Sequence, residues 1–411
     1  MHTLKLSEIA ALSGFGLAVA SSAFAQTGQV KPPQAQAWID VATFSGLGMP
    51  AGMSGGNPMA MMGSLLGGGA KNTFGNTQAT SAGRWVDVTL YSRNNPTLPE
   101  AQQAVPAAFL APSLKLQSPK EAKSAPVGDD DTVTPEPQFE RPKGKLLMYW
   151  GCGAAVRAGQ PKVLDMATAS PADIAKFFAA RRATQRGTHS TPGRPVWPSP
   201  ADPRMVPDNA SLAGQHTLSG AGVPEPFSFQ IPPGQDLMPA LHVQQKQQAG
   251  ATDLNWAALP TARAYFIAGM GAGKNEEMIV WTSSEVPEMG FGLLDYQTNP
   301  AVDRWLKEGV LLPTSTTHCT VPQGVFAGQP GLLRAIAYGN ELNLAHPPRP
   351  SDPKAAWEPL WAVKVRVKSV ATVMLGMGSS DESASNARGA EPAPAENKVK
   401  PLDVLKGIFG R

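Results

Sequence analysis

Charged residues are scarce in this chain. Asp, Glu, Lys and Arg make up 16% of its 411 residues, whereas about 25% is usual. The formal net charge is only +3, so the composition shows no nucleic-acid footprint. Hydrophobic residues reach 42%, which is enough to bury a core and excludes a charged, disordered polymer. Glycine and proline are abundant, with 41 and 40 residues, and this density excludes a mainly helical chain.

Long hydrophobic runs are also missing. The apolar run 9–20 is shorter than the ~20 residues that span a bilayer, and no later stretch of that length is free of charge, Pro or Gly. Lys5 precedes the run, and Ala23 and Ala25 occupy the two positions that a signal peptidase reads. We therefore predict a signal peptide over 1–25, a periplasmic or secreted location in a Gram-negative bacterium, and no transmembrane segment after cleavage.

Composition divides the rest of the chain into six predicted parts. Stretches rich in Gly, Pro, Ser or charge interrupt the segments with strand or helix patterns. The parts are N-terminal β segments with a Gly/Met-rich tract (26–92), a Pro/charged linker (93–145), β segments plus a helix (146–185), a Pro-rich linker (186–207), a β-sandwich domain (208–375), and a disordered tail with a short amphipathic helix at its end (376–411).

Strand patterns dominate between these joints. The pattern W-[IV]-D-V-x-x-[FY]-S occurs at 38–45 and again at 85–92, which predicts neighbouring strands in one sheet. Eight further short strands are predicted in the second half, at 227–231, 241–244, 254–259, 262–269, 278–283, 314–321, 333–338 and 361–375. The fold class is therefore mainly β, with β-sandwich-like domains.

Other local patterns add a hairpin of strands and two short helices. Segments 146–150 and 162–166 are typical of strands on either side of a Gly-rich turn. Ser170 as N-cap, Pro171 and Asp173 predict a helix that ends near Thr184. Residues 300–307 form a second predicted helix.

Segment 254–265, Leu-Asn-Trp-Ala-Ala-Leu-Pro-Thr-Ala-Arg-Ala-Tyr, resembles the passage between strands B and C of fibronectin type III-like sandwiches. The resemblance extends to Trp281 and implies that Trp256 and Tyr265 lie on facing strands and fill the core. Segments 150–153, 283–288 and 319–322 resemble secreted proteobacterial proteins of unassigned function, and this likeness implies no particular chemistry.

The two cysteines are Cys152 and Cys319. An even count in an oxidising compartment favours a disulfide between them. The alternative is a thiolate nucleophile at Cys152, on a Gly-Cys-Gly turn, with a histidine as base. The disulfide is favoured because neither cysteine has a recognised local signature.

Five methionines, without any acid nearby, crowd one tract: Met49, Met53, Met59, Met61 and Met62. Thioethers are soft ligands that select Cu(I), but Met also fills irregular apolar gaps. The absence of His and Cys from the tract favours the second interpretation, and we expect no cofactor.

Other candidate motifs are weak. Residues 52–56 match G-x-S-x-G outside the strand-to-helix context that the motif needs, and 269–274 are better explained as a hairpin than as a phosphate loop. The mature histidines are scattered singly, which excludes a legible zinc motif: His189, His216, His242, His318 and His346. Glu285 and Glu288 could form a glycosidase dyad, but a solvated loop is favoured.

Nine tryptophans are present, and Trp197, in the Pro-rich linker, is the best candidate for an exposed residue that stacks on a sugar. The tail 401–411 has an apolar helical face that could contact a partner or a membrane surface. We predict an exported, non-catalytic envelope protein with a binding or structural role; its ligand and partner are unknown, and a glycan or another envelope protein is the candidate partner. The alternatives are Cu(I) handling by the Met-rich tract and a secreted hydrolase or thiol enzyme.

Overall fold

A computed structural model describes residues 30–46, 72–79, 81–120, 144–179, 181–183, 187–275, 277–326, 328–352 and 354–375. The fold is mainly β, as predicted. One 15-stranded sheet runs in the order β6 (Lys162–Asp165), β5 (Lys145–Trp150), β13 (Glu277–Thr282), β12 (Ala264–Ala272), β16 (Gly331–Tyr338), β18 (Trp361–Leu375), β1 (Ala35–Gly46), β2 (Gly83–Ser92), β7 (Val196–Trp197), β4 (Ser113–Gln117), β3 (Glu100–Ala104), β8 (Gly214–Ser219) and β9 (Phe227–Ile231).

Smaller elements complete the fold. β14 (Leu312–Pro313) pairs with β12, and β17 (Leu342–His346) pairs with β18. A second sheet has the order β10 (Val243–Gln248), β11 (Ala251–Trp256) and β15 (His318–Val321). The helical elements are α2 (Pro171–Phe177), α3 (Asn299–Lys307) and the 3-10 turns η1 (Asn76–Gln78) and η2 (Pro233–Gln235). Within the described residues, no helix is long and apolar enough to cross a bilayer.

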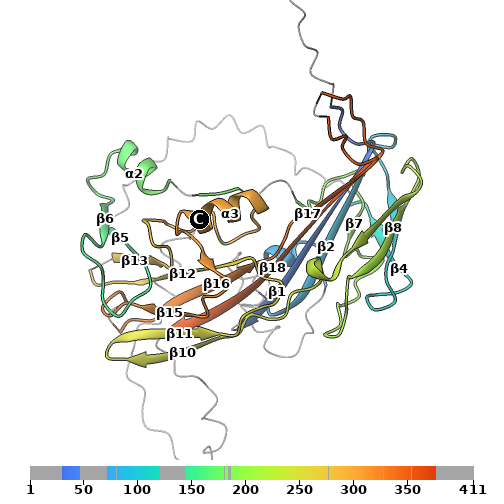
Figure 1. The fold of residues 1–411 in the computed structure, drawn as a ribbon. Helices are drawn as coiled ribbons and strands as arrows, with labels where there is room; N and C mark the ends of the chain where they lie inside the picture. Colours follow the sequence, from blue (N-terminus) through green and yellow to red (C-terminus); the bar gives the residue numbers. More distant parts are fainter. Residues whose placement is uncertain are drawn as a thin grey trace, which may run out of the picture.

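The centre of the large sheet consists of β18, β1 and β2, the long strands that cross the middle of Figure 1. β1 and β2 carry the repeated W-[IV]-D-V pattern and are neighbours in the sheet, as predicted; the structure shows that they pair antiparallel. Their register places Asp40 directly opposite Asp87. β18 lies parallel to β1 and places Arg366 opposite Asp40 on the other side. Strands more than 300 residues apart in sequence are therefore neighbours.

The alternation along these strands separates two faces. One face is aliphatic and belongs to the main hydrophobic core; it includes Ile39 and Val41 of β1, Val88 of β2, and Val365 and Val367 of β18. The other face presents the aspartates, Arg366 and Lys368, which are also buried. Period-2 alternation normally places one face in solvent. Here both faces are covered, so the charges have to be compensated inside the protein.

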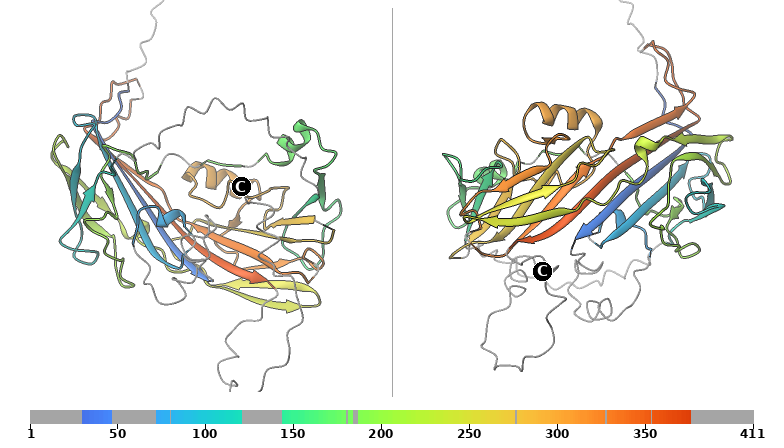
Figure 2. Two further views of the ribbon diagram at one scale, coloured as in Figure 1. Left: turned by 180° about the vertical axis from the view of Figure 1, so that it is seen from behind. Right: turned by 60° about the horizontal axis from the view of Figure 1, so that its bottom comes forward.

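The sheet curls at its β9 edge, as the two views in Figure 2 show. Trp361, at the start of β18, stacks on Phe227 of β9 with ring centroids 4.9 Å apart. The Trp361 Nε1 group donates a hydrogen bond to the Pro226 carbonyl at 2.8 Å. The curl encloses the aliphatic face, because β9 returns to the beginning of a strand that lies seven places away in the sheet.

The other half of the sheet is covered on both faces (Figures 1 and 2). α3 contributes Val302 and Trp305 to a cluster with Phe44 and Phe266, and the β10–β11–β15 sheet contributes Leu254 to the main core. Trp256 of β11 and Tyr265 of β12 pack edge to face at 5.6 Å, so the two residues singled out by the fibronectin resemblance do contact each other across the two sheets.

The capped helix forms but is shorter than predicted. Ser170 Oγ accepts a hydrogen bond from the Asp173 amide, and Asp173 Oδ2 accepts one from the Ser170 amide, both at 3.1 Å. α2 ends at Phe177 instead of near Thr184. Beyond it, Arg181 forms an ion pair with Glu288 at 2.8 Å. These tertiary contacts draw the chain away from the helical path that local sequence favours.

Strands from several of the predicted parts meet in the large sheet. β5 of the part 146–185 pairs in parallel with β13 of the part 208–375. β7, from the predicted Pro-rich linker, pairs with β2 and β4. The predicted exposure of Trp197 is wrong, because this residue lies in β7 opposite Val88 and is completely buried. Proline content alone does not show that a segment is covered by neighbouring strands.

Candidate functional site

The two cysteines are joined. Cys152 follows β5 and Cys319 lies in β15, and their Cα atoms are 5.2 Å apart in a disulfide. This confirms the predicted bridge, and it leaves no thiolate at Cys152 to act as a nucleophile. The bridge connects the large sheet to the small one. Backbone hydrogen bonds reinforce the junction, because the Gly153 amide donates to the Thr320 carbonyl at 2.9 Å.

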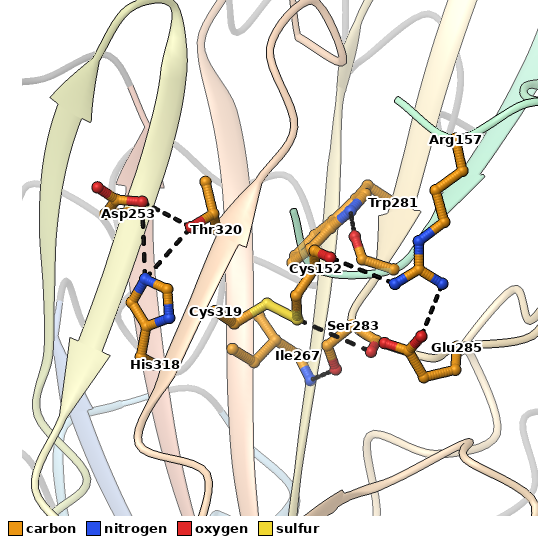
Figure 3. The surroundings of a disulfide bond; sticks show 11 residues. Cys152, Arg157, Asp253, Ile267, Trp281, Ser283, Glu285, His318, Cys319 and Thr320 are labelled. Carbon is orange, nitrogen blue, oxygen red and sulfur yellow. Dashed lines mark hydrogen bonds and ion pairs between the residues drawn. A yellow bond between two sulfur atoms is a disulfide. The ribbon is translucent and has the colours of Figure 1, made fainter. Parts of the chain in front are cut away.

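Polar groups surround the disulfide on two sides (Figure 3). On one side Arg157 forms an ion pair with Glu285 at 2.6 Å. On the other, Thr320 Oγ1 donates to Asp253 Oδ1 at 2.6 Å, and His318 Nε2 lies 3.7 Å from the same carboxylate oxygen. His318 and Asp253 are both partly open to solvent. The two groups brace the surface of the junction, on opposite sides of the bridge in Figure 3.

The buried charges gather around Asp40, in the centre of the sheet. Arg366 donates to both oxygens of Asp40, from Nε and Nη2, at 2.6 Å each. Thr188 donates to Asp40 Oδ2 from its amide at 3.0 Å and from its hydroxyl at 2.6 Å. Burial lowers the pKa of Arg366, but the Asp40 carboxylate outweighs it and raises the pKa above its ordinary value. Arg366 is therefore charged, and the Asp40 carboxyl oxygens accept four hydrogen bonds.

Backbone packing beside this pair requires a glycine. A Cβ atom on Gly187 would lie 1.7 Å from Arg366 Nη2 and 2.7 Å from Asp40 Oδ2. The segment that carries Thr188 can approach the carboxylate only because residue 187 has no side chain.

Asp87 holds a different segment. Its carboxylate accepts hydrogen bonds from the Gly75 amide at 3.1 Å, from the Thr77 amide at 3.3 Å and from the Thr77 hydroxyl, so it anchors η1 to β2. Burial raises its pKa to about 7, although the hydrogen bonds from Thr77 and Gly75 oppose this shift and Asp40 adds to it. The carboxylate of Asp87 is thus hydrogen-bonded to neutral groups, whereas Asp40 and Asp295 accept hydrogen bonds from Arg366 and Lys368.

Lys368 completes the cluster at the other end. Its Nζ donates to Asp295 at 3.1 Å and lies 4.2 Å from the ring centroid of Tyr296, and the Tyr296 hydroxyl donates to the Val41 carbonyl at 3.0 Å. Burial lowers the pKa of Lys368 and raises that of Tyr296. These contacts fix the segment before α3 to the sheet. Asp40 is only 1% exposed, and the contacts of the cluster brace chain segments against the sheet.

A cavity of about 610 Å³ opens beside the ends of β1 and β2. This volume lies in the ~300–1,000 Å³ range of small-molecule sites. Its lining comes from the end of β1, the start of β2, Asp208 and the segment between η2 and β10: Thr43, Phe44, Ser45, Gly46, Ala82, Gly83, Arg84, Asp208, Leu237, Met238, Pro239, Ala240 and His242.

Hydrogen bonds hold the wall of the cavity in place. Thr43 Oγ1 donates to the Met238 carbonyl at 2.7 Å, and Ser45 Oγ donates to the Leu241 carbonyl. Just before this wall, Asp236 Oδ1 accepts a hydrogen bond from the Leu212 amide at 2.6 Å. The two hydroxyl donors are thus used within the protein, and the segment that forms the wall is fixed at both ends.

The structure separates most of the other residues singled out by sequence. Glu285 and Glu288 each form an ion pair with a different arginine, Arg157 and Arg181. The five histidines lie apart: His189 packs against Trp38, buried His216 contacts Gln103, His242 borders the cavity, His318 lies near the disulfide and His346 stacks on Trp361. The Met-rich tract, the G-x-S-x-G match, the signal peptide and the C-terminal tail lie outside the described residues.

Sequence reasoning missed the buried cluster and the cavity. A signal for the cluster was available, because Asp40 and Asp87 are acids inside two β-branched strands and the cations Arg366 and Lys368 alternate with valines in a third. No pattern pointed to the cavity, whose lining comes from distant segments.

Comparisons with known proteins add no family assignment. No family model matches the chain, and no curated protein or solved structure is detectably similar to it. The fibronectin resemblance and the proteobacterial origin therefore stay predictions.

Proposed function

We propose that this chain is an exported, non-catalytic protein of the bacterial envelope with a binding role. The observation that carries the proposal is the disulfide between Cys152 and Cys319. Such bonds persist in the periplasm and outside the cell, whereas the cytosol keeps thiols reduced. The predicted signal peptide over 1–25 supports the same location.

A binding role is preferred to catalysis for two reasons. The thiol that could have acted as a nucleophile is consumed in the bridge, and the acids Glu285 and Glu288 are each held by an arginine instead of facing one another. The cavity beside β1 and β2, by contrast, has the volume of a small-molecule site and a wall fixed by internal hydrogen bonds.

Thiol labelling in cell fractions tests the export. The chain would be expressed with its own N-terminus in a Gram-negative host, and each fraction would be denatured, because Cys319 is buried, and treated with a maleimide reagent before and after reduction. We expect the protein in the periplasm or medium, unlabelled before reduction and labelled at two sites after it. The matched control is a variant lacking residues 2–25, which should stay in the cytosol with two reactive thiols. Reactive thiols in protein recovered from the envelope would contradict the proposal.

A further inference from the structure

We propose that the cavity beside β1 and β2 binds a small amphipathic monocarboxylate, with the carboxylate at Arg84 and the apolar body against the segment 237–240. This inference rests on the proposed binding role and names its site and ligand class.

Within the described part of the chain, the cation in the cavity has no carboxylate in direct contact. Arg84 is partly buried, and its Nη1 donates to the main-chain carbonyls of Pro207 and Asp208. Among the described residues, no carboxylate lies within 4 Å of its guanidinium in an ion pair. Burial lowers the pKa of Arg84, and the more distant charges of Asp236 and Asp208 oppose this shift only in part. A guanidinium placed this way has donors left for a ligand carboxylate, which it can bind through two parallel hydrogen bonds.

The other polar groups narrow the ligand class. The hydroxyls of Thr43 and Ser45 already donate to main-chain carbonyls, so the donors that remain are Arg84 and His242. Asp208 also lines the cavity, and its negative charge acts on Arg84. A ligand with two negative charges, such as a phosphate monoester, would be repelled by Asp208, whereas a singly charged carboxylate satisfies Arg84 at a smaller electrostatic cost.

The rest of the wall is apolar. Leu237, Met238, Pro239 and Ala240 line the cavity in one continuous segment. Leu237 and Met238 are buried and belong to the main core, so this wall cannot move without disturbing the aliphatic face of the sheet. The apolar surface that a ligand body would remove from water here belongs to Pro239 and Ala240, because Leu237 and Met238 are already buried.

Calorimetric titration of the full chain with octanoate, below the concentration at which it forms micelles, tests the proposal. Octanol lacks the charge, acetate lacks the apolar body and octyl phosphate carries the second charge. We expect octanoate to bind at least tenfold more tightly than any of these, because a hydrogen-bonded charge pair and the apolar contact are both needed. Equal affinity for octanol would overturn the role of Arg84, and no binding of octanoate would overturn the ligand class.

Variants separate the site from the fold. Arg84→Gln should weaken octanoate binding about tenfold or more, Arg84→Lys should retain part of it, and Asp208→Asn should strengthen octyl phosphate binding. The matched control is Arg349→Gln, which removes a cation that lies over Trp357 instead of in the cavity. Each variant is first checked for an unchanged unfolding midpoint. Unchanged octanoate affinity in a folded Arg84→Gln protein would refute the inference, whereas the proposed export would still stand or fall by thiol labelling.

Discussion

Protonation of Asp87 should make the stability of this protein depend on pH in an unusual direction. The residue is buried, and its pKa in the folded protein is raised from 3.8 to about 7. The cause is burial in the centre of the sheet, which disfavours the charged carboxylate more than the three hydrogen bonds from Gly75 and Thr77 favour it. The folded protein therefore binds a proton at Asp87 more tightly than the unfolded chain does.

The sign and size of the effect follow from this difference. A folded-state pKa above the unfolded value contributes stability that is fully present below pH 3.8 and is lost as the pH rises through about 7. At 1.36 kcal/mol per pKa unit, the contribution is about 4 kcal/mol. Most acids in proteins act in the opposite direction, because salt bridges and hydrogen bonds usually lower their pKa.

Urea unfolding followed by tryptophan fluorescence between pH 4 and pH 8 measures the effect. The free energy of unfolding of the wild type minus that of Asp87→Asn should fall by about 4 kcal/mol over this range, because the variant cannot titrate at this position. Contributions from all other groups cancel in the difference. The matched control is Asp352→Asn, which removes an exposed carboxylate instead of a buried one and should not reproduce this fall. A flat difference for Asp87→Asn, or one that grows with pH, would refute the reasoning.

Three further predictions concern the buried ion pair, the disulfide and the Met-rich tract. Asp40→Asn and Arg366→Met should each lower the free energy of unfolding by about 3–5 kcal/mol, because each leaves a buried charge unpaired. The double variant should lose less stability than the sum of the two single variants. Additive losses in urea unfolding would contradict a direct interaction between Asp40 and Arg366. Replacing Cys152 and Cys319 by serine should cost about 5 kcal/mol, given the 167-residue separation, and unchanged unfolding midpoints would argue against the bridge. Cu(I) should bind the full chain and an alanine variant of the five methionines with equal affinity, whereas weaker binding by the variant would favour the copper alternative. That variant replaces Met49, Met53, Met59, Met61 and Met62.

Much of the fold could be predicted because it follows from local patterns. The capping residues Ser170 and Asp173 act over three positions, so the start of α2 is predictable. The end of α2 is not, because Arg181 is drawn to Glu288, more than 100 residues later. The predicted exposure of Trp197 was wrong for the same reason, because β2 and β4, the strands that pair with β7, are distant from it in sequence. The candidate site was less predictable still, since no local pattern links Arg84 to the segment 237–242.

The amino-acid sequence alone determined the mainly β class, the placement of the two W-[IV]-D-V strands as neighbours in one sheet and the partnership of the two cysteines. These features depend on alternation, on residue propensity and on a count of two sulfurs, all of which are properties of the chain itself. Only the tertiary structure decided that β18 lies parallel to β1 and that Asp40 meets Arg366 under a covered face. Parallel pairing between distant segments depends on how all the strands of the sheet pack together to bury their apolar faces. No sequence pattern within a single segment indicates which distant strand will be its neighbour.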